Sequence, residues 1–67
     1  MEKEVELGAL PQVRAIAGVS RSEIYRRVAA KTFPAPVRLG PRCTRWNLPE
    51  VRAWVAARLA ERDRVAA

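Results

Sequence analysis

Histidine is absent from this 67-residue sequence, and cysteine occurs once, at Cys43. The commonest general base is therefore missing, and neither a Ser/His nor a Cys/His pair can be assembled. A zinc site would have to combine Cys43 with carboxylates, which is a poor ligand set. A single cysteine also excludes an internal disulfide bond. We therefore predict no enzymatic activity, no catalytic residue, no metal site and no cofactor.

Long apolar runs are absent as well. No stretch approaches the roughly 20 apolar residues of a membrane-spanning helix, and the acidic start MEKEVELGAL lacks the apolar segment of a secretory signal. The length predicts one domain with a thin core, because a chain of this size buries only about 60% of its unfolded surface. Together with the free thiol, these features predict a cytoplasmic protein with no membrane partner.

Basic residues outnumber acidic residues by 13 to 7, and the excess lies in the middle of the chain. Eight basic residues and one acid between Arg14 and Arg45 give this segment a charge of +7, whereas residues 1–13 carry −2 and residues 46–67 carry +1. Such a concentration of positive charge is typical of a protein that binds a polyanion. A solvated basic surface without a partner gives the same pattern, and charge alone does not separate the two interpretations.

Two short helices are predicted in the first half of the chain. The first spans residues 10–17, with a proline in its first turn and Gly18 after its last residue. The second begins at Ser20, because Ser20 and Glu23 form the S-x-x-E pattern of a capping box. It should end near residue 30 or 31, since Pro34 and Pro36 disfavour helix in the residues that precede them.

A short hairpin and a third helix are predicted in the second half. Residues 37–46 alternate as a hairpin, with Val37, Leu39, Thr44 and Trp46 on an apolar face and Arg38 and Arg45 pointing away. Asn47 should cap the third helix, with Glu50 three residues later. Its inner stripe is expected at Val51, Trp54, Val55, Arg58 and Leu59, and its end after Arg62. The expected layout is an acidic tail at residues 1–8, a domain at 9–63 and a frayed end at 64–67.

The tight Gly-Val-Ser connection between the first two helices is typical of a helix-turn-helix. In that motif the second helix enters the major groove of DNA, where arginine can bind guanine through two parallel hydrogen bonds. The hairpin has the length of a wing that contacts the minor groove or the flanking backbone. The predicted fold is mainly α with a small β-hairpin, a winged helix-turn-helix of three helices plus wing. The expected major-groove residues are Arg21, Ser22, Tyr25 and Arg26, and the expected wing and backbone residues are Arg27, Arg38, Arg42 and Arg45.

The stretch from Val19 to Val55 resembles the AlpA family of phage and mobile-element regulators. The resemblance is carried by GVSRSEIYR, FPAPVRLG, Arg45-Trp46 and the E-V-x-A-W of the last helix, in that order. It implies a DNA-binding regulator related to excisionase and MerR-type winged helix-turn-helix proteins, acting on integrase or excision genes. Glu23 departs from the family pattern, which often has Thr there. Glu23 would repel phosphate, accept from cytosine N4 or cap the helix, and we favour the cap.

Several alternatives stay open on the sequence. An excisionase-like architectural factor would bend DNA without activating transcription itself, and a protein-interaction module would use the basic face for an acidic partner. A single small module buries only roughly 600–1,000 Å² on DNA, so we expect a homodimer or tandem copies on double-stranded DNA. Integrase and RNA polymerase are further candidate contacts. Cys43 is expected to be a passive strand residue, and a redox role would need a low thiol pKa.

Overall fold

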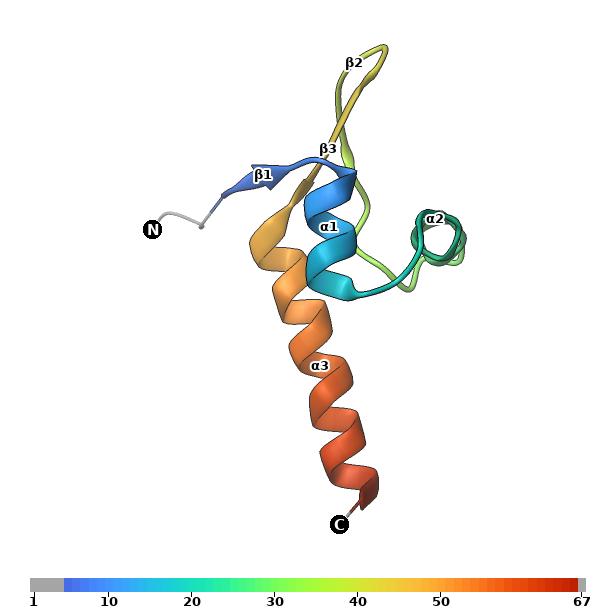
Figure 1. The fold of residues 1–67 in the computed structure, drawn as a ribbon, viewed down its shortest axis with the longest axis vertical. Coiled ribbons are helices and arrows are strands. Elements are labelled where there is room, and N and C mark those ends of the chain that lie inside the picture. The colour runs from blue at the N-terminus through green and yellow to red at the C-terminus, as the bar shows by residue number, and fades with distance from the viewer. Residues whose placement is uncertain (1–4, 67) are drawn as a thin grey trace.

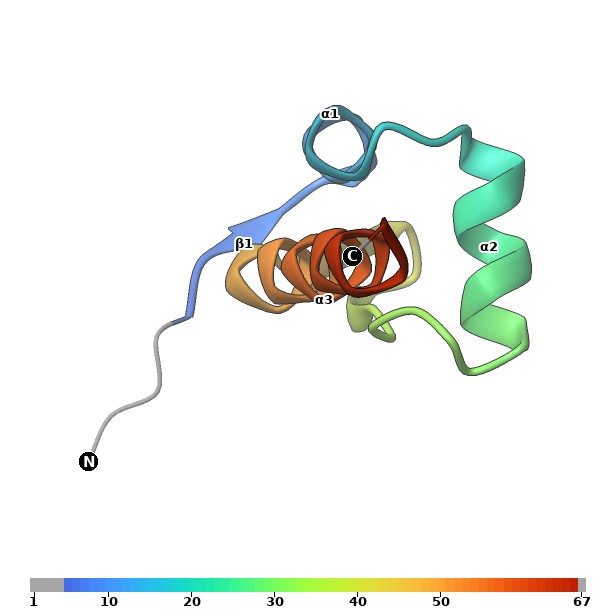
Figure 2. The same cartoon turned by 90° about the horizontal axis from the view of Figure 1, so that it is seen from below.

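In residues 5–66, which the computed structural model describes, three helices accompany a small antiparallel sheet (Figure 1). The predicted mainly helical fold is confirmed, and it is compatible with a winged helix-turn-helix. Seen along the third helix, the first helix lies beside it and the second lies crosswise at the edge (Figure 2). The elements are β1 (Leu7–Gly8), α1 (Leu10–Ala17), α2 (Arg21–Ala29), β2 (Val37–Gly40), β3 (Cys43–Asn47) and α3 (Leu48–Ala66).

Helix α1 has the predicted bounds, and its two ends have separate local causes. At the start, Gln12 Oε1 accepts a 2.8 Å hydrogen bond from the Ala9 N–H. At the end, Gly18 adopts a left-handed conformation with φ of 74°, and its N–H donates to the Arg14 carbonyl at 2.7 Å. Glycine accepts this conformation without the steric penalty of a Cβ atom. The chain therefore turns sharply here, before α2 begins.

Helix α2 starts after Ser20, whose Oγ accepts from the Glu23 N–H at 3.2 Å. This confirms one half of the predicted capping box. The other half was wrong, because the Glu23 carboxylate pairs with arginines one turn further along instead. The helix ends at Ala29, close to the predicted end, and Lys31 takes a left-handed conformation with φ of 64°.

The sheet has a third strand that the sequence did not predict. Its order is β1-β3-β2, with Leu7 opposite Asn47 and Gly8 opposite Trp46. Leu7 and Gly8 are thus part of the fold and not of the expected tail; residues 1–4 of that tail lie outside the described residues. The Asn47 Oδ1 accepts from the Glu6 N–H at 3.1 Å, and the Leu48 N–H donates to the Glu6 carbonyl at 2.7 Å. The Asn47 side chain was expected to cap α3, but it binds the backbone of Glu6 instead and so holds the segment before β1 against the end of β3.

The hairpin forms where predicted, but the predicted division into faces was wrong. Val37 lies opposite Arg45 and Arg38 lies opposite Thr44. Residues directly opposite each other in an antiparallel pair project to the same face, so Val37 shares its face with Arg45. Val37 is 43% exposed and does not belong to a buried apolar face, whereas Trp46 is buried on the core side. The register depends on the turn and on the irregular pairing between Arg38 and Gly40, which the alternation in the sequence does not reveal.

Helix α3 is longer than expected and continues through Ala66. The predicted end after Arg62 was wrong, and the expected frayed residues 64–66 are helical in backbone; Ala67 lies outside the described residues. Of the predicted inner stripe, Val51 is buried and Trp54 and Val55 are half-buried, but Arg58 and Leu59 are exposed. The helix runs beyond the rest of the described domain (Figure 1), and residues 56–64 are exposed.

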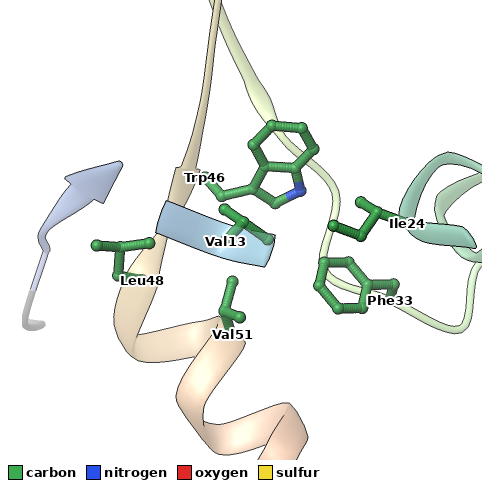
Figure 3. Packing of buried hydrophobic residues seen from close by; sticks show 6 residues of the cluster. All are labelled: Val13, Ile24, Phe33, Trp46, Leu48 and Val51. Carbon is green, nitrogen blue, oxygen red and sulfur yellow. The ribbon is translucent and has the colours of Figure 1, made fainter. Parts of the chain in front are cut away.

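The core is one small cluster to which almost every element contributes (Figure 3). Figure 3 shows the side chains of the six buried residues, which come from α1, α2, the connector before β2, β3 and α3. Partly buried apolar residues, among them Ile16 and Val28, pack around them. The cluster therefore holds both helices of the helix-turn-helix against α3. Its buried members are Val13, Ile24, Phe33, Trp46, Leu48 and Val51.

Substitution of Gly8 by alanine should destabilise the domain. A Cβ atom at Gly8 would lie 2.7–2.9 Å from Cδ1, Cδ2 and Cγ of the buried Leu48. Overpacking of this kind costs about 1–3 kcal/mol. At Gly40 a Cβ would meet only Cys43 Cβ at 3.7 Å, so Gly40→Ala is the matched control, with an expected change within about 0.5 kcal/mol. Urea unfolding of the three proteins tests this, and equal effects of the two substitutions would contradict it.

Candidate nucleic-acid interface

The position of α2 depends on its two ends and on one buried side chain. Ile24 is fully buried, and it anchors the middle of α2 in the core. The Gly18 turn fixes the start of α2 relative to α1. The connector from Thr32 to Pro34 fixes its end, since the Trp54 Nε1–H donates to the Thr32 carbonyl at 2.7 Å and the Trp46 Nε1–H donates to the Pro34 carbonyl at 3.1 Å. Phe33 lies between these two bonds and is 6% exposed.

The aromatic rings strengthen the same arrangement. Phe33 packs edge-on against Trp54, with ring centroids 4.9 Å apart. Tyr25 contacts Trp46 in the same manner at 6.0 Å. Edge-to-face pairs of this kind add about 0.5–1.5 kcal/mol beyond the area they bury. These contacts hold the inner side of α2 and the connector after it against Trp46 and Trp54, so the outer face of α2 is exposed.

The four predicted major-groove residues are exposed along α2. Arg21, Ser22 and Arg26 are exposed, with the Arg26 side chain 75% accessible, and Tyr25 is 39% exposed. The Arg21 guanidinium lies over the Tyr25 ring, 5.2 Å from its centroid. Tyr25 therefore contacts the core residue Trp46 with its ring, and the same ring supports the exposed Arg21. The structure brings these residues together on one helix, with a polar and basic outer surface.

Glu23 organises the charges within α2. Its carboxylate forms ion pairs with both Arg26 and Arg27. The hydrogen bond from Arg26 and its positive charge hold the pKa of Glu23 below its ordinary value against partial burial, which acts in the opposite direction, and Arg27 lowers it further. Because one carboxylate serves two guanidinium groups, the cluster keeps a net positive charge. Arg26 remains accessible at its outer side.

Arg27 has different surroundings from Arg26. Its side chain is 36% exposed, and its guanidinium lies 5.5 Å from the centroid of the Trp54 ring. Its Nε atom is 2.7 Å from a Glu23 oxygen but forms no aligned hydrogen bond among the described residues. Arg58 of α3 lies at the same distance from the Trp54 ring. The i+4 spacing of Arg58 from Trp54 on one helix was a signal in the sequence for this contact.

The wing arginines are not equivalent. Arg38 and Arg42 are exposed, whereas Arg45 is half-buried and its Nη1 donates to the Thr44 carbonyl at 2.9 Å. The hairpin projects well away from the helices (Figure 1). Arg42 lies in the turn between β2 and β3, at the outer end of that hairpin. Arg38 and Arg42 are therefore the freer groups for an external anion.

The described residues contain no cluster of three or more carboxylate or thiol side chains that could hold a metal ion. None of the helices between residues 5 and 66 has the length and apolar content needed to cross a membrane.

Two short helices joined by a tight turn, followed by a projecting hairpin, are compatible with the winged helix-turn-helix class. Residues 9–59 match the family described as "Prophage CP4-57 regulatory protein (AlpA)". The chain therefore belongs to the AlpA family of prophage regulatory proteins.

A relative from Enterobacteria phage P4, described as "Uncharacterized protein ORF88", is 42% identical over 55 residues. The aligned region covers 82% of this chain and 62% of that protein, so the chain spans less than two thirds of its relative. No solved structure matches the chain significantly.

The carboxyl group of Glu23 should titrate below the ordinary glutamate range. Arg26→Gln should raise this pKa more than Arg27→Gln, because the hydrogen bond and charge of Arg26 come first among its causes. Since the folded-state pKa is lowered, the stabilising contribution is present above the unfolded-state pKa and is lost as pH falls through the folded value. An NMR titration of the Glu23 side-chain carbonyl measures each pKa. A larger rise in Arg27→Gln would contradict this ordering.

Proposed function

We propose that the protein is a sequence-specific double-stranded DNA-binding regulator that acts on phage or prophage genes for integration or excision. The observation that carries the proposal is the placement of Arg21, Ser22, Tyr25 and Arg26 along the exposed side of α2. This helix is the second one of a helix-turn-helix, the position that enters the major groove. Membership of a regulatory family supports the same function.

Within this proposal, Arg26 reads a base edge. One side of its exposed guanidinium forms an ion pair with Glu23. The side chain therefore loses less conformational freedom when it binds DNA. A planar guanidinium can bind guanine O6 and N7 through two parallel hydrogen bonds. Arg21, Ser22 and Tyr25 contact phosphate or neighbouring base edges. Glu23 acts through Arg26 and Arg27, and its helix capping is limited to the backbone N–H bound by Ser20.

The remaining arginines bind the phosphate backbone. Arg38 and Arg42 lie on the wing and contact DNA beside the groove that α2 occupies. Arg27 and Arg45 are half-buried, so we assign them a weaker, flanking role. Phosphate contacts position the protein and carry no base specificity. The high positive charge of residues 14–45 supports such contacts.

One copy offers a limited surface, since a single module of this class buries roughly 600–1,000 Å². We propose that two or more copies bind one control region, as a dimer or in tandem. Spaced, phased direct repeats in the bound DNA would favour an architectural role in excision. A site upstream of an integrase or excisionase gene would favour transcriptional control. Integrase and RNA polymerase are the candidate protein contacts.

Selection from a pool of random duplexes at two salt concentrations tests the function. We expect an enriched motif for the unmodified protein and an affinity that falls steeply with salt, because bound arginines release counterions from DNA. Binding to no duplex at low salt would overturn the proposal and favour a protein-interaction module.

Arg26→Ala and Arg42→Gln should have different effects on the selected site. Loss of Arg26 should cost about 1–3 kcal/mol and relax the preference at one base position, whereas loss of Arg42 should weaken binding to all sequences and reduce the salt slope by about one. Arg62→Gln is the matched control, because Arg62 lies in the part of α3 that runs away from α2 and pairs with Asp63. Fluorescence anisotropy measures the affinities. Uniform weakening by Arg26→Ala would remove its role in base readout.

A further inference from the structure

Strand β2 is an exposed edge strand with an unusual mixture of side chains. It lies at the outer edge of the sheet, and Val37, Arg38 and Leu39 are all exposed. Leu39 is 56% exposed, which places it among the most exposed large apolar residues of the described chain. An apolar edge strand is a liability in solution unless something covers it. The alternation in the sequence predicted Leu39 on an apolar face of the hairpin.

A break in the strand pairing explains the exposure of Leu39. Arg38 pairs with Thr44 and Gly40 pairs with Cys43, so Leu39 has no partner residue on β3. This irregularity leaves an extra residue on the β2 side. A bulge of this kind bends the strand and redirects a side chain. Here it leaves the Leu39 side chain exposed near the outer end of the wing, next to the Pro41-Arg42 turn.

The charges around Leu39 indicate what covers it. Residues 32–49 contain three arginines and no acidic residue. Arg38 precedes Leu39 directly, and Arg42 follows across the turn, and both are exposed. An apolar tip flanked by two exposed cations is complementary to a polyanion that also offers an apolar surface. The minor groove of DNA combines both properties, with phosphates along its walls and base steps at its floor that open to an apolar wedge.

We propose that Leu39 is an apolar wedge that enters the minor groove and kinks the DNA beside the site occupied by α2. This proposal rests on the proposed DNA-binding function and adds a bending step to it. Leucine is one of the residues that partially unstack a base step in this way, with kinks of roughly 20–90°. Arg38 and Arg42 bind the phosphates on the two walls and hold the wing in place.

The proposal implies a sequence preference at a position that no arginine reads. Pyrimidine–purine steps such as TA and CA unstack easily, whereas A-tracts are stiff. A selected site should therefore prefer a flexible step where the wing lies. Leu39→Ala should lose that preference, while the motif read by α2 stays unchanged.

The test compares the unmodified protein with Leu39→Ala, Leu39→Met and Leu7→Ala. Leu7 is the matched control, because it is also a partly exposed leucine, 41% accessible, but lies on β1 at the opposite edge of the sheet. Binding to the selected duplex is followed by anisotropy at several salt concentrations. The bend is followed by energy transfer between dyes at the two ends of that duplex, and circular dichroism verifies that each variant is folded.

We expect Leu39→Ala to bind roughly tenfold more weakly, because an apolar side chain is no longer buried, and to lose most of the bend. Its salt slope should not change, since no charge is removed. Leu39→Met should restore the bend, and Leu7→Ala should behave as the unmodified protein.

An unchanged bend and affinity in Leu39→Ala would overturn the wedge while leaving DNA binding intact. Equal weakening by Leu39→Ala and Leu7→Ala would also overturn it, and would indicate instead that the sheet contacts another protein copy. Absence of binding by the unmodified protein at low salt would overturn both proposals together.

Discussion

Two indole hydrogen bonds to one short connector determine how α2 and the hairpin are placed relative to each other in this domain. Trp46 on β3 and Trp54 on α3 donate to the carbonyls of Pro34 and Thr32, on either side of the buried Phe33. These carbonyls belong to the segment that joins α2 to the wing. Because both indoles come from the rigid sheet and α3, the end of α2 and the start of the hairpin cannot move independently. Trp46 is buried, and a buried donor left without its partner would cost about 1–3 kcal/mol, which is a large share of the stability of so small a domain.

The charges of α2 follow from the same support. With Ile24 and the connector holding its inner side, the helix turns Arg21, Tyr25 and Arg26 outward. Glu23 then binds two arginines at once and limits their movement. An exposed ion pair contributes little to stability. In the proposed DNA complex its value is orientation, because a pre-positioned guanidinium loses less conformational freedom on binding.

The rest of the chain is divided between support and extension. The short strand β1 returns to β3 through Glu6, Asn47 and Leu48, and so ties the N-terminal segment to the start of α3. The later turns of α3 leave the body and bury little. Although about half of the residues are hydrophobic, six side chains form the buried core of the described residues.

The sequence by itself determined the local events: the Gly18 stop, the Ser20 cap, the bounds of α1 and the resemblance that led to the AlpA family. These depend on neighbouring residues, and their signals are short and specific. Only the tertiary structure decided the strand β1, the role of Asn47, the partners of Glu23, the hairpin register and the exposure of Leu39 and Arg58. Each of these depends on residues distant in sequence, or on which of several nearby groups a side chain binds. Long-range pairing leaves no periodic pattern in the chain, so a two-residue strand or a bulge becomes visible only when the core has brought its neighbours together.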